Sequence, residues 1–258
     1  MKETQIILIS FICVCIGLFV GVNAIPFNDN HQRYVDSVNH FIGEPSPGLK
    51  FSGYEYTPHA TYSVLFNNNM EFWINEDNFL VERYSSYDEL KDCNKILISE
   101  KEALNIAESF AKIHDIRYDS KCLMVNETGL INGGDIIQYN FLWREYINGI
   151  ESPNFTYISI NPSSGKIVNY IGINRPITIN ITSKLTENDV VNIAKHHFKD
   201  VEIDTIETKL KIGYTNNGAQ KLLWECKVYG KPKDYTLTGG ILLIDAETGE
   251  IIQIGSWL

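Results

Sequence analysis

The chain has 258 residues, of which 44% are hydrophobic and 12% aromatic, and its formal net charge is −10 at pH 7. This length is enough for two ordinary globular domains. The shortage of Lys and Arg argues against nucleic acid as a partner, since binding there depends on neutralising phosphates, and against anionic membrane surfaces. We interpret the acidity mainly as a source of solubility.

The first segment has the features of a signal peptide. Lys2 precedes an apolar run over residues 6–20, and Val22 and Ala24 fit positions −3 and −1 of a cleavage site. The run is shorter than the about 20 residues that a membrane span needs. The sequence therefore predicts a signal peptide over 1–24 and an extracytoplasmic protein, secreted or held in the cell envelope. The alternative is an uncleaved anchor, and only that alternative makes the membrane a partner.

Residues 25–92 are expected to form a degenerate N-terminal unit of one helix and a β-meander. Apolar residues between Tyr34 and Ile42 predict a short helix, which a Pro- and Gly-containing stretch at 44–48 ends. Runs rich in β-branched and aromatic residues follow it. We expect strands near 52–57, 61–66, 70–75 and 79–84.

Two fuller units are expected over 93–176 and 184–258. Ser99 and Glu102 have the spacing of a capping box before an amphipathic helix, and Thr186 is the expected cap of the second helix. Each helix leads into strands, one of which carries a Leu-Trp pair. An amphipathic helix followed by a meander packs across the sheet that the strands form.

One sequence pattern typical of a β-hairpin occurs three times, and we call it the frame. Counting from an Asn or Asp, a glycine or phenylalanine follows four residues later, and apolar residues follow six and nine residues later. The copies are Asn75 with Phe79, Val81 and Tyr84; Asn161 with Gly165, Ile167 and Tyr170; and Asp245 with Gly249, Ile251 and Ile254. Asn and Asp side chains favour turns, and glycine supplies positive φ.

The third copy, Asp245-Ala-Glu-Thr-Gly-Glu250, holds three carboxylates and resembles a small metal loop. Its twin, Asn161-Pro-Ser-Ser-Gly-Lys166, keeps the frame without a carboxylate. A metal site would not lose every acidic ligand in a repeat, so we predict a β-turn and no bound metal.

The helix motif EALNIAESFAK, the strand YNFLWREYINGI and the terminal LLIDAETGEIIQI together resemble the PepSY family, over roughly 98–171 and 184–258. The stretch Trp143–Ile150 also looks like the propeptide domain that precedes thermolysin-type proteases. The resemblance implies an α+β fold of tandem units, each with one helix packed on an antiparallel, cystatin-like β-sheet. It also implies a non-catalytic module that restrains peptidases, and it carries no binding residues onto numbered positions here.

Catalytic patterns are missing from the sequence. None of the six histidines has the spacing of a zinc protease, and Cys93, Cys122 and Cys226 lack a nucleophile signature. The three cysteines leave one disulfide with a spare thiol, or three thiols, both open. We therefore expect no enzyme activity, no cofactor and no catalytic residue.

Surface features supply the remaining candidates. Sequons predict N-glycosylation at Asn126, Asn154 and Asn180. Trp143, Tyr146 and Trp224 are candidates for an aromatic contact surface, although burial in the core is the more common fate of large rings. The leading hypothesis is an exported binding module that restrains or chaperones a peptidase or another envelope protein in trans. A structural spacer of the cell envelope is the alternative.

Overall fold

The computed structural model describes residues 30–91, 95–114, 116, 123–125, 130–131, 134–135, 138–231 and 238–256. The predicted signal peptide over 1–24, Cys93, Cys122 and the sequon at Asn126 lie outside these residues. Within the described part, none of the helices has the length and apolar character of a membrane-crossing segment.

The N-terminal unit forms as the sequence predicts, with a helix followed by four antiparallel strands. These are α2 (His31–Ile42), β1 (Lys50–Thr57), β2 (Ala60–Phe66), β3 (Met70–Asn75) and β4 (Val81–Ser86). Each strand pairs with the next in the chain. The strand boundaries fall within two residues of the expected ones.

The short helix α3 (Tyr87–Lys91) ends the N-terminal unit. The second and third units also begin with a helix that leads into strands. The second holds α4 (Glu100–Ile113), β5 (Leu123–Val125), β6 (Leu130–Ile131), β7 (Gly134–Asp135), β8 (Tyr139–Ile147), β9 (Ile150–Ile160) and β10 (Ile167–Ile173). The third holds α5 (Glu187–His197), β11 (Ile203–Tyr214), β12 (Gln220–Gly230), β13 (Gly239–Asp245) and β14 (Ile251–Ser256). Ser99 with Glu102 forms the predicted capping box of α4, and Thr186 caps α5 with Asp189 as its box partner.

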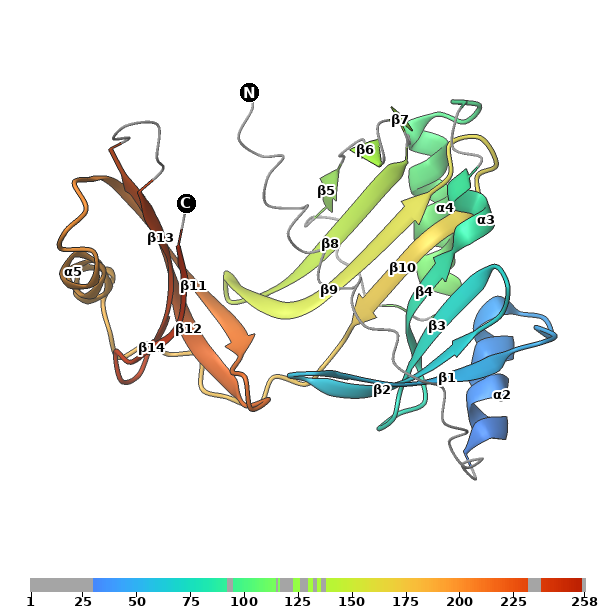
Figure 1. Cartoon of the computed structure of the whole chain (residues 1–258), viewed down its shortest axis with the longest axis horizontal. Coiled ribbons are helices and arrows are strands. Elements are labelled where there is room, and N and C mark those ends of the chain that lie inside the picture. The colour runs from blue at the N-terminus through green and yellow to red at the C-terminus, as the bar shows by residue number, and fades with distance from the viewer. Residues whose placement is uncertain are drawn as a thin grey trace.

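The units join into one curved mixed sheet, so the fold is α+β with few helices (Figure 1). Across the described residues this sheet has twelve strands, and β6 and β7 pair separately. Strand β4 pairs with β10, which links the first unit to the second. The third unit joins where Lys211 of β11 pairs with Glu151 of β9 in parallel. That parallel contact corrects the expectation of purely antiparallel sheets.

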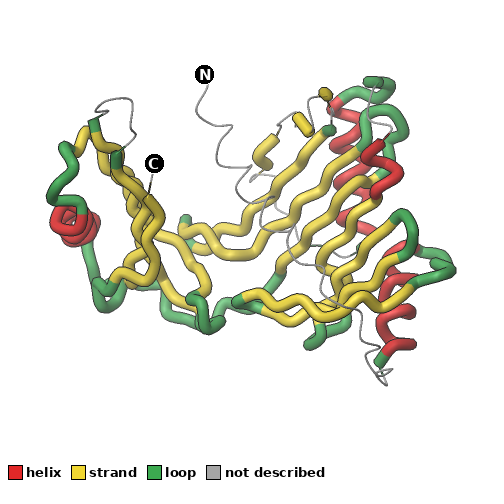
Figure 2. The backbone as a smooth tube through the Cα atoms, viewed as in Figure 1, coloured by secondary structure: helices red, strands yellow, loops and turns green. Residues whose placement is uncertain are grey.

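The helices lie on the outer side of the bend, and the strands line its inner side (Figure 2). One hydrophobic core serves the first two units, because Phe41 of α2 contacts both Phe110 of α4 and Tyr170 of β10. The third unit has its own core beneath α5. The boundary expected at residue 92 therefore separates two sequence units but not two cores.

The three hairpin copies fold alike, which confirms the predicted turn. In each copy the amide of the Asn or Asp donates to the residue five positions later, and the amide four positions later donates back to the Asn or Asp carbonyl. The side-chain oxygens of Asn75, Asn161 and Asp245 accept from the amide two residues on. The residue four positions later has positive φ, even where it is Phe79.

Each hairpin also contains a β-bulge at the same offset. The pairing skips one residue seven positions after the Asn or Asp, namely Glu82, Val168 and Ile252. A bulge shifts the alternation of side chains between the two faces of a strand by one residue. It therefore explains why the apolar positions of the frame lie three residues apart, whereas an unbroken strand would repeat at two.

The segment before each complete helix is fastened to the turn of its own unit. The amides of Leu97 and Ile98 donate to the carbonyl of Pro162, and those of Lys184 and Leu185 donate to Ala246. The helices then pack on the turn glycine: a Cβ at Gly249 would lie 3.4 Å from Cδ1 of Ile193. Helix and hairpin thus position each other.

We predict that Gly249→Ala lowers the free energy of unfolding by about 1–2 kcal/mol, because φ at this position is +79° and an L-residue is strained there. Denaturant titration of the purified chain measures the change. Glu247→Ala, in the same turn but exposed, is the matched control and should stay within about 0.5 kcal/mol of the wild type. Equal effects of the two substitutions would contradict the shared-turn interpretation.

Candidate functional site

The first two units leave one face of their sheet without a covering helix among the described residues; we call it the open face. A row of directly opposed residues crosses it from β3 to β8: Trp73, Arg83, Ile171, Tyr157 and Leu142. All five are partly exposed, whereas their chain neighbours Phe72, Tyr170, Ile158 and Phe141 face the helices and are buried. We call these five residues the cross-strand row.

Next to this row lies a buried ion pair between Glu82 and Arg175. Only 5% of the Glu82 side chain and 12% of the Arg175 side chain are exposed. Arg175 donates to both carboxylate oxygens, with Nη2 at 2.6 Å from Oε2. Tyr62 adds a hydroxyl hydrogen bond to Oε2 (2.9 Å), and Asn75 Nδ2 donates to Oε1 (3.0 Å). The carboxylate is thereby neutralised and fully hydrogen-bonded.

Arg175 follows β10, at the start of the segment that leads to the third unit, and its backbone is held as tightly as its side chain. Asn154 of β9 accepts from the Arg175 amide (2.8 Å) and donates to the Arg175 carbonyl (2.8 Å). Asn154 also donates to Glu145 (2.8 Å). Arg175 therefore ties β4 of the first unit to β9 of the second.

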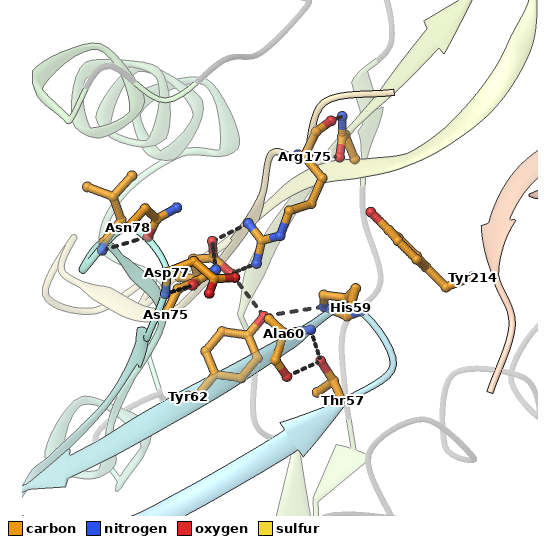
Figure 3. Close-up of polar contacts among 12 residues, drawn as sticks. Thr57, His59, Ala60, Tyr62, Asn75, Asp77, Asn78, Arg175 and Tyr214 are labelled. Atoms are coloured by element: carbon orange, nitrogen blue, oxygen red, sulfur yellow. Dashed lines mark hydrogen bonds and ion pairs between the residues drawn. The ribbon is translucent and has the colours of Figure 1, made fainter. Parts of the chain in front are cut away.

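The third unit touches the same cluster through β11, as Figure 3 shows. The rings of His59 and Tyr214 lie 5.4 Å apart. In the loop after β11, a Cβ at Gly218 would lie 2.4 Å from the carbonyl oxygen of Pro58, so only glycine permits this close approach. All three units thus meet at the cluster.

Burial sets the titration behaviour of the cluster. Desolvation, then the Glu82 charge, raises the pKa of Tyr62 above its usual range. Desolvation, then the charge of Arg175, lowers the pKa of His59. The Tyr62 hydroxyl gives its one hydrogen to Glu82, so His59 Nε2 is the donor in their 3.2 Å contact. The neutral side chains of Tyr62, His59 and Asn75 thus surround the Glu82–Arg175 ion pair. An ion pair enclosed in this way suits a structural role, and we call the pair the joint.

The Asp245 loop behaves as a turn rather than as a cluster of ligands. Asp245 accepts from the amides of Glu247 and Thr248 and pairs with Lys221, while Glu247 pairs with Lys184. Among the described residues, no group of three His, Cys, Asp or Glu side chains is placed to hold a metal ion.

The three aromatic candidates do not form one surface. Trp143 is 2% exposed and belongs to the core shared with α4, so it is removed from the candidate contact surface. Trp224 is partly buried, packs beside the core under α5 and donates to Ser183 Oγ (3.0 Å). Tyr146 is 41% exposed, with the ammonium of Lys209 5.8 Å from its ring centroid. Of the three, only Tyr146 is largely exposed, and Trp224 is partly exposed.

The two described sequon asparagines differ. Asn180 is exposed in the segment before α5. Asn154 is 5% exposed and its amide nitrogen makes the two hydrogen bonds given above, so the folded protein does not present that nitrogen for modification. Glycosylation at both positions stays a prediction.

Sequence reasoning missed Trp73, Glu82, Arg83 and Arg175. The signal lay in the repeat itself. Where the first hairpin has Glu82-Arg83 at its bulge, its twins have Val168-Asn169 and Ile252-Gln253. A charged pair at a position that the other copies fill without charge is a departure that folding does not require.

The fold defines an α+β protein with a large mixed sheet. Its structure resembles the Bacillus megaterium YpeB C-terminal domain, at 14% sequence identity and a TM-score of 0.42, over 88% of this chain and 97% of that one. At those values the likeness carries no argument about a site or a partner. No protein-family model and no curated protein matches the sequence.

We predict that Arg175→Ala or Glu82→Ala lowers the free energy of unfolding by about 3–5 kcal/mol, because each leaves the other charge buried without its partner. Thermal or denaturant unfolding measures the loss. Lys231→Ala, which removes an exposed ion pair with Glu202, is the control and should have little effect. If neither substitution lowered the free energy of unfolding more than Lys231→Ala does, the Glu82–Arg175 ion pair would not be what holds these strands together.

We also predict an acid-sensitive contribution from His59. Because its pKa is lowered in the folded state, the unfolded chain binds the proton more readily, and stability falls as the pH drops below about 6.5. His59→Gln should flatten the decline of stability measured between about pH 7 and 5. His196→Gln, at an exposed position of α5, is the control. Parallel curves for wild type and His59→Gln would refute the prediction.

Proposed function

We propose that the chain is an exported, non-catalytic module of tandem PepSY-like units that binds a protein partner and restrains or chaperones it, a peptidase being the partner class that the PepSY resemblance implies. Three copies of one helix-and-hairpin unit support the tandem interpretation. Export rests on the predicted signal peptide over 1–24.

The cross-strand row is the observation that carries the binding function. It places a Trp, an Arg, a Tyr and two aliphatic side chains, all partly exposed, side by side on five paired strands. Trp, Tyr and Arg are the residues enriched at energetic hot spots of protein interfaces. The neighbouring ion pair and the shared core hold these strands rigid, which lowers the entropic cost of binding.

The second candidate is a structural spacer of the cell envelope. It is favoured by the contacts of Arg175, which fasten the first unit to the second, and by the approach of Gly218 to Pro58, which adds the third. A spacer needs rigid units and has no use for a row of partly exposed aromatic, basic and aliphatic side chains. We therefore place it second.

Affinity capture from the exported fraction of the producing cells tests the binding function. We expect the wild-type chain from residue 25 onwards to retain one protein reproducibly, and Tyr157→Ala on the cross-strand row to lose it. Tyr56→Ala is the matched control, since Tyr56 is 73% exposed and lies in β1, away from the row. Thermal melting checks that both variants fold.

Two outcomes would count against the proposal. Recovery of wall or lattice components alone, unaffected by Tyr157→Ala, would favour the spacer. Equal loss of the captured protein with Tyr56→Ala would show that binding does not use the open face.

A further inference from the structure

The cross-strand row contains a guanidinium that the described residues leave without an acid. The guanidinium carbon of Arg83 lies 4.5 Å from the centroid of the Trp73 ring and 5.7 Å from that of Tyr62. Within the described part of the chain, Arg83 forms no ion pair, and its buried Nε has no hydrogen-bond acceptor. Buried polar groups almost always have a partner, so this one calls for an explanation.

The acidic side chains nearest along the two strands are already engaged. Glu82, the neighbour of Arg83 in the bulge, is bound through both oxygens by Arg175 and also by Tyr62 and Asn75. Glu71 on β3 accepts from Trp73 Nε1 (2.7 Å) and from the Tyr87 hydroxyl (3.1 Å). Arg175 thus binds both oxygens of the acid next to Arg83, and both oxygens of Glu71 accept hydrogen bonds from other side chains.

The fold itself does not require this arrangement. At the positions of Trp73 and Arg83 the second hairpin pairs Ser159 with Asn169, and the third pairs Leu243 with Gln253. Those copies form the same bulge without a cation or an indole. The Trp–Arg pair therefore serves something other than the hairpin.

The geometry selects the ligand chemistry. Stacking on Trp73 occupies the face of the guanidinium and leaves its edge, where N–H groups match the two oxygens of a carboxylate. One unpaired cation suits one negative charge. Arg144, which lies on the same face, is already paired with Glu151 at 3.1 Å. Ile171, Tyr157 and Leu142 extend an apolar track from Arg83 along the row, which suits an extended segment with apolar residues beside its acid.

We propose that Arg83, stacked on Trp73, binds a side-chain carboxylate of an extended acidic and apolar segment of a partner protein that lies along the cross-strand row. This deepens the proposed function and rests on it. The carboxylate supplies the acid that Arg83 lacks, and the apolar neighbours of that acid contact Ile171 and Tyr157.

The direct test is calorimetric titration of the chain with an acetylated, amidated peptide of alternating Val and Glu, beside its Val and Gln counterpart. We expect saturable binding of the Glu peptide and about tenfold or more weaker binding of the Gln peptide, since a charge-assisted pair is lost. Arg83→Gln should weaken the Glu peptide by about the same factor and leave the Gln peptide unchanged. Arg83→Lys should fall between, because an ammonium cannot form the bidentate pair.

Arg144→Gln is the matched control, since it removes a paired arginine from the same face, and it should bind the Glu peptide as the wild type does. Melting curves should show that Arg83→Gln remains folded. Absence of binding by the wild type, equal binding of the two peptides, or unchanged binding by Arg83→Gln would each overturn the proposal. Displacement of the peptide by inorganic phosphate at equal concentration would also overturn it, because the site would then take any anion.

Capture of the partner separates this inference from the proposed function. If wild type and Arg83→Gln retain the same protein equally, the binding function stands and the carboxylate site falls. If the wild type retains nothing yet binds the Glu peptide through Arg83, the site stands and the partner-binding function falls.

Discussion

The extra residue in each hairpin is the constraint on which the rest of the structure depends. By shifting the alternation of side chains after the turn, the bulge sends Tyr84 and Tyr170 to the helices while the residue before each stays on the other side. The core and the open face are therefore both set by one backbone irregularity. In the first unit the same irregularity brings Glu82 and Arg83 together beside the Tyr62 ring.

The buried ion pair then turns repeated units into one body. A buried pair contributes little net stability over apolar packing, but it is costly to break, so it favours one arrangement of the strands that carry it. Arg175 binds Glu82 through its guanidinium and Asn154 through its backbone, which fixes the first two units at one point. The contact of Gly218 with Pro58 brings the third unit to the same place.

Much of the fold could be predicted because its helix starts and turns depend on interactions between residues close in sequence. Ser99 and Thr186 indicate where two helices begin, and the Asn or Asp frame predicts the turns. Both features depend on hydrogen bonds between residues close in the chain. The joining of the units could not be predicted, because the pairs of β4 with β10 and of β11 with β9 connect residues far apart.

The candidate site was harder still to predict. Trp143 is of a residue type that is common at interfaces, but the alternation of side chains along β8 places it on the buried face. Trp73 and Arg83 are unremarkable in sequence and meet only because β3 and β4 pair with a bulge. The choice of Trp143 as a contact residue therefore failed because it needed the register of strands, which a single sequence does not reveal.

The shared core of the first two units has a consequence for how the chain folds as it is synthesised from the N-terminus. Phe41 needs Phe110 and Tyr170 for its contacts, and β4 needs β10 as its neighbour. Residues 30–91 alone would present an unpaired strand and a half-filled apolar layer, features that promote aggregation. The N-terminal unit can complete its packing only after about residue 173 has been synthesised. The chain is therefore most prone to aggregation before that point.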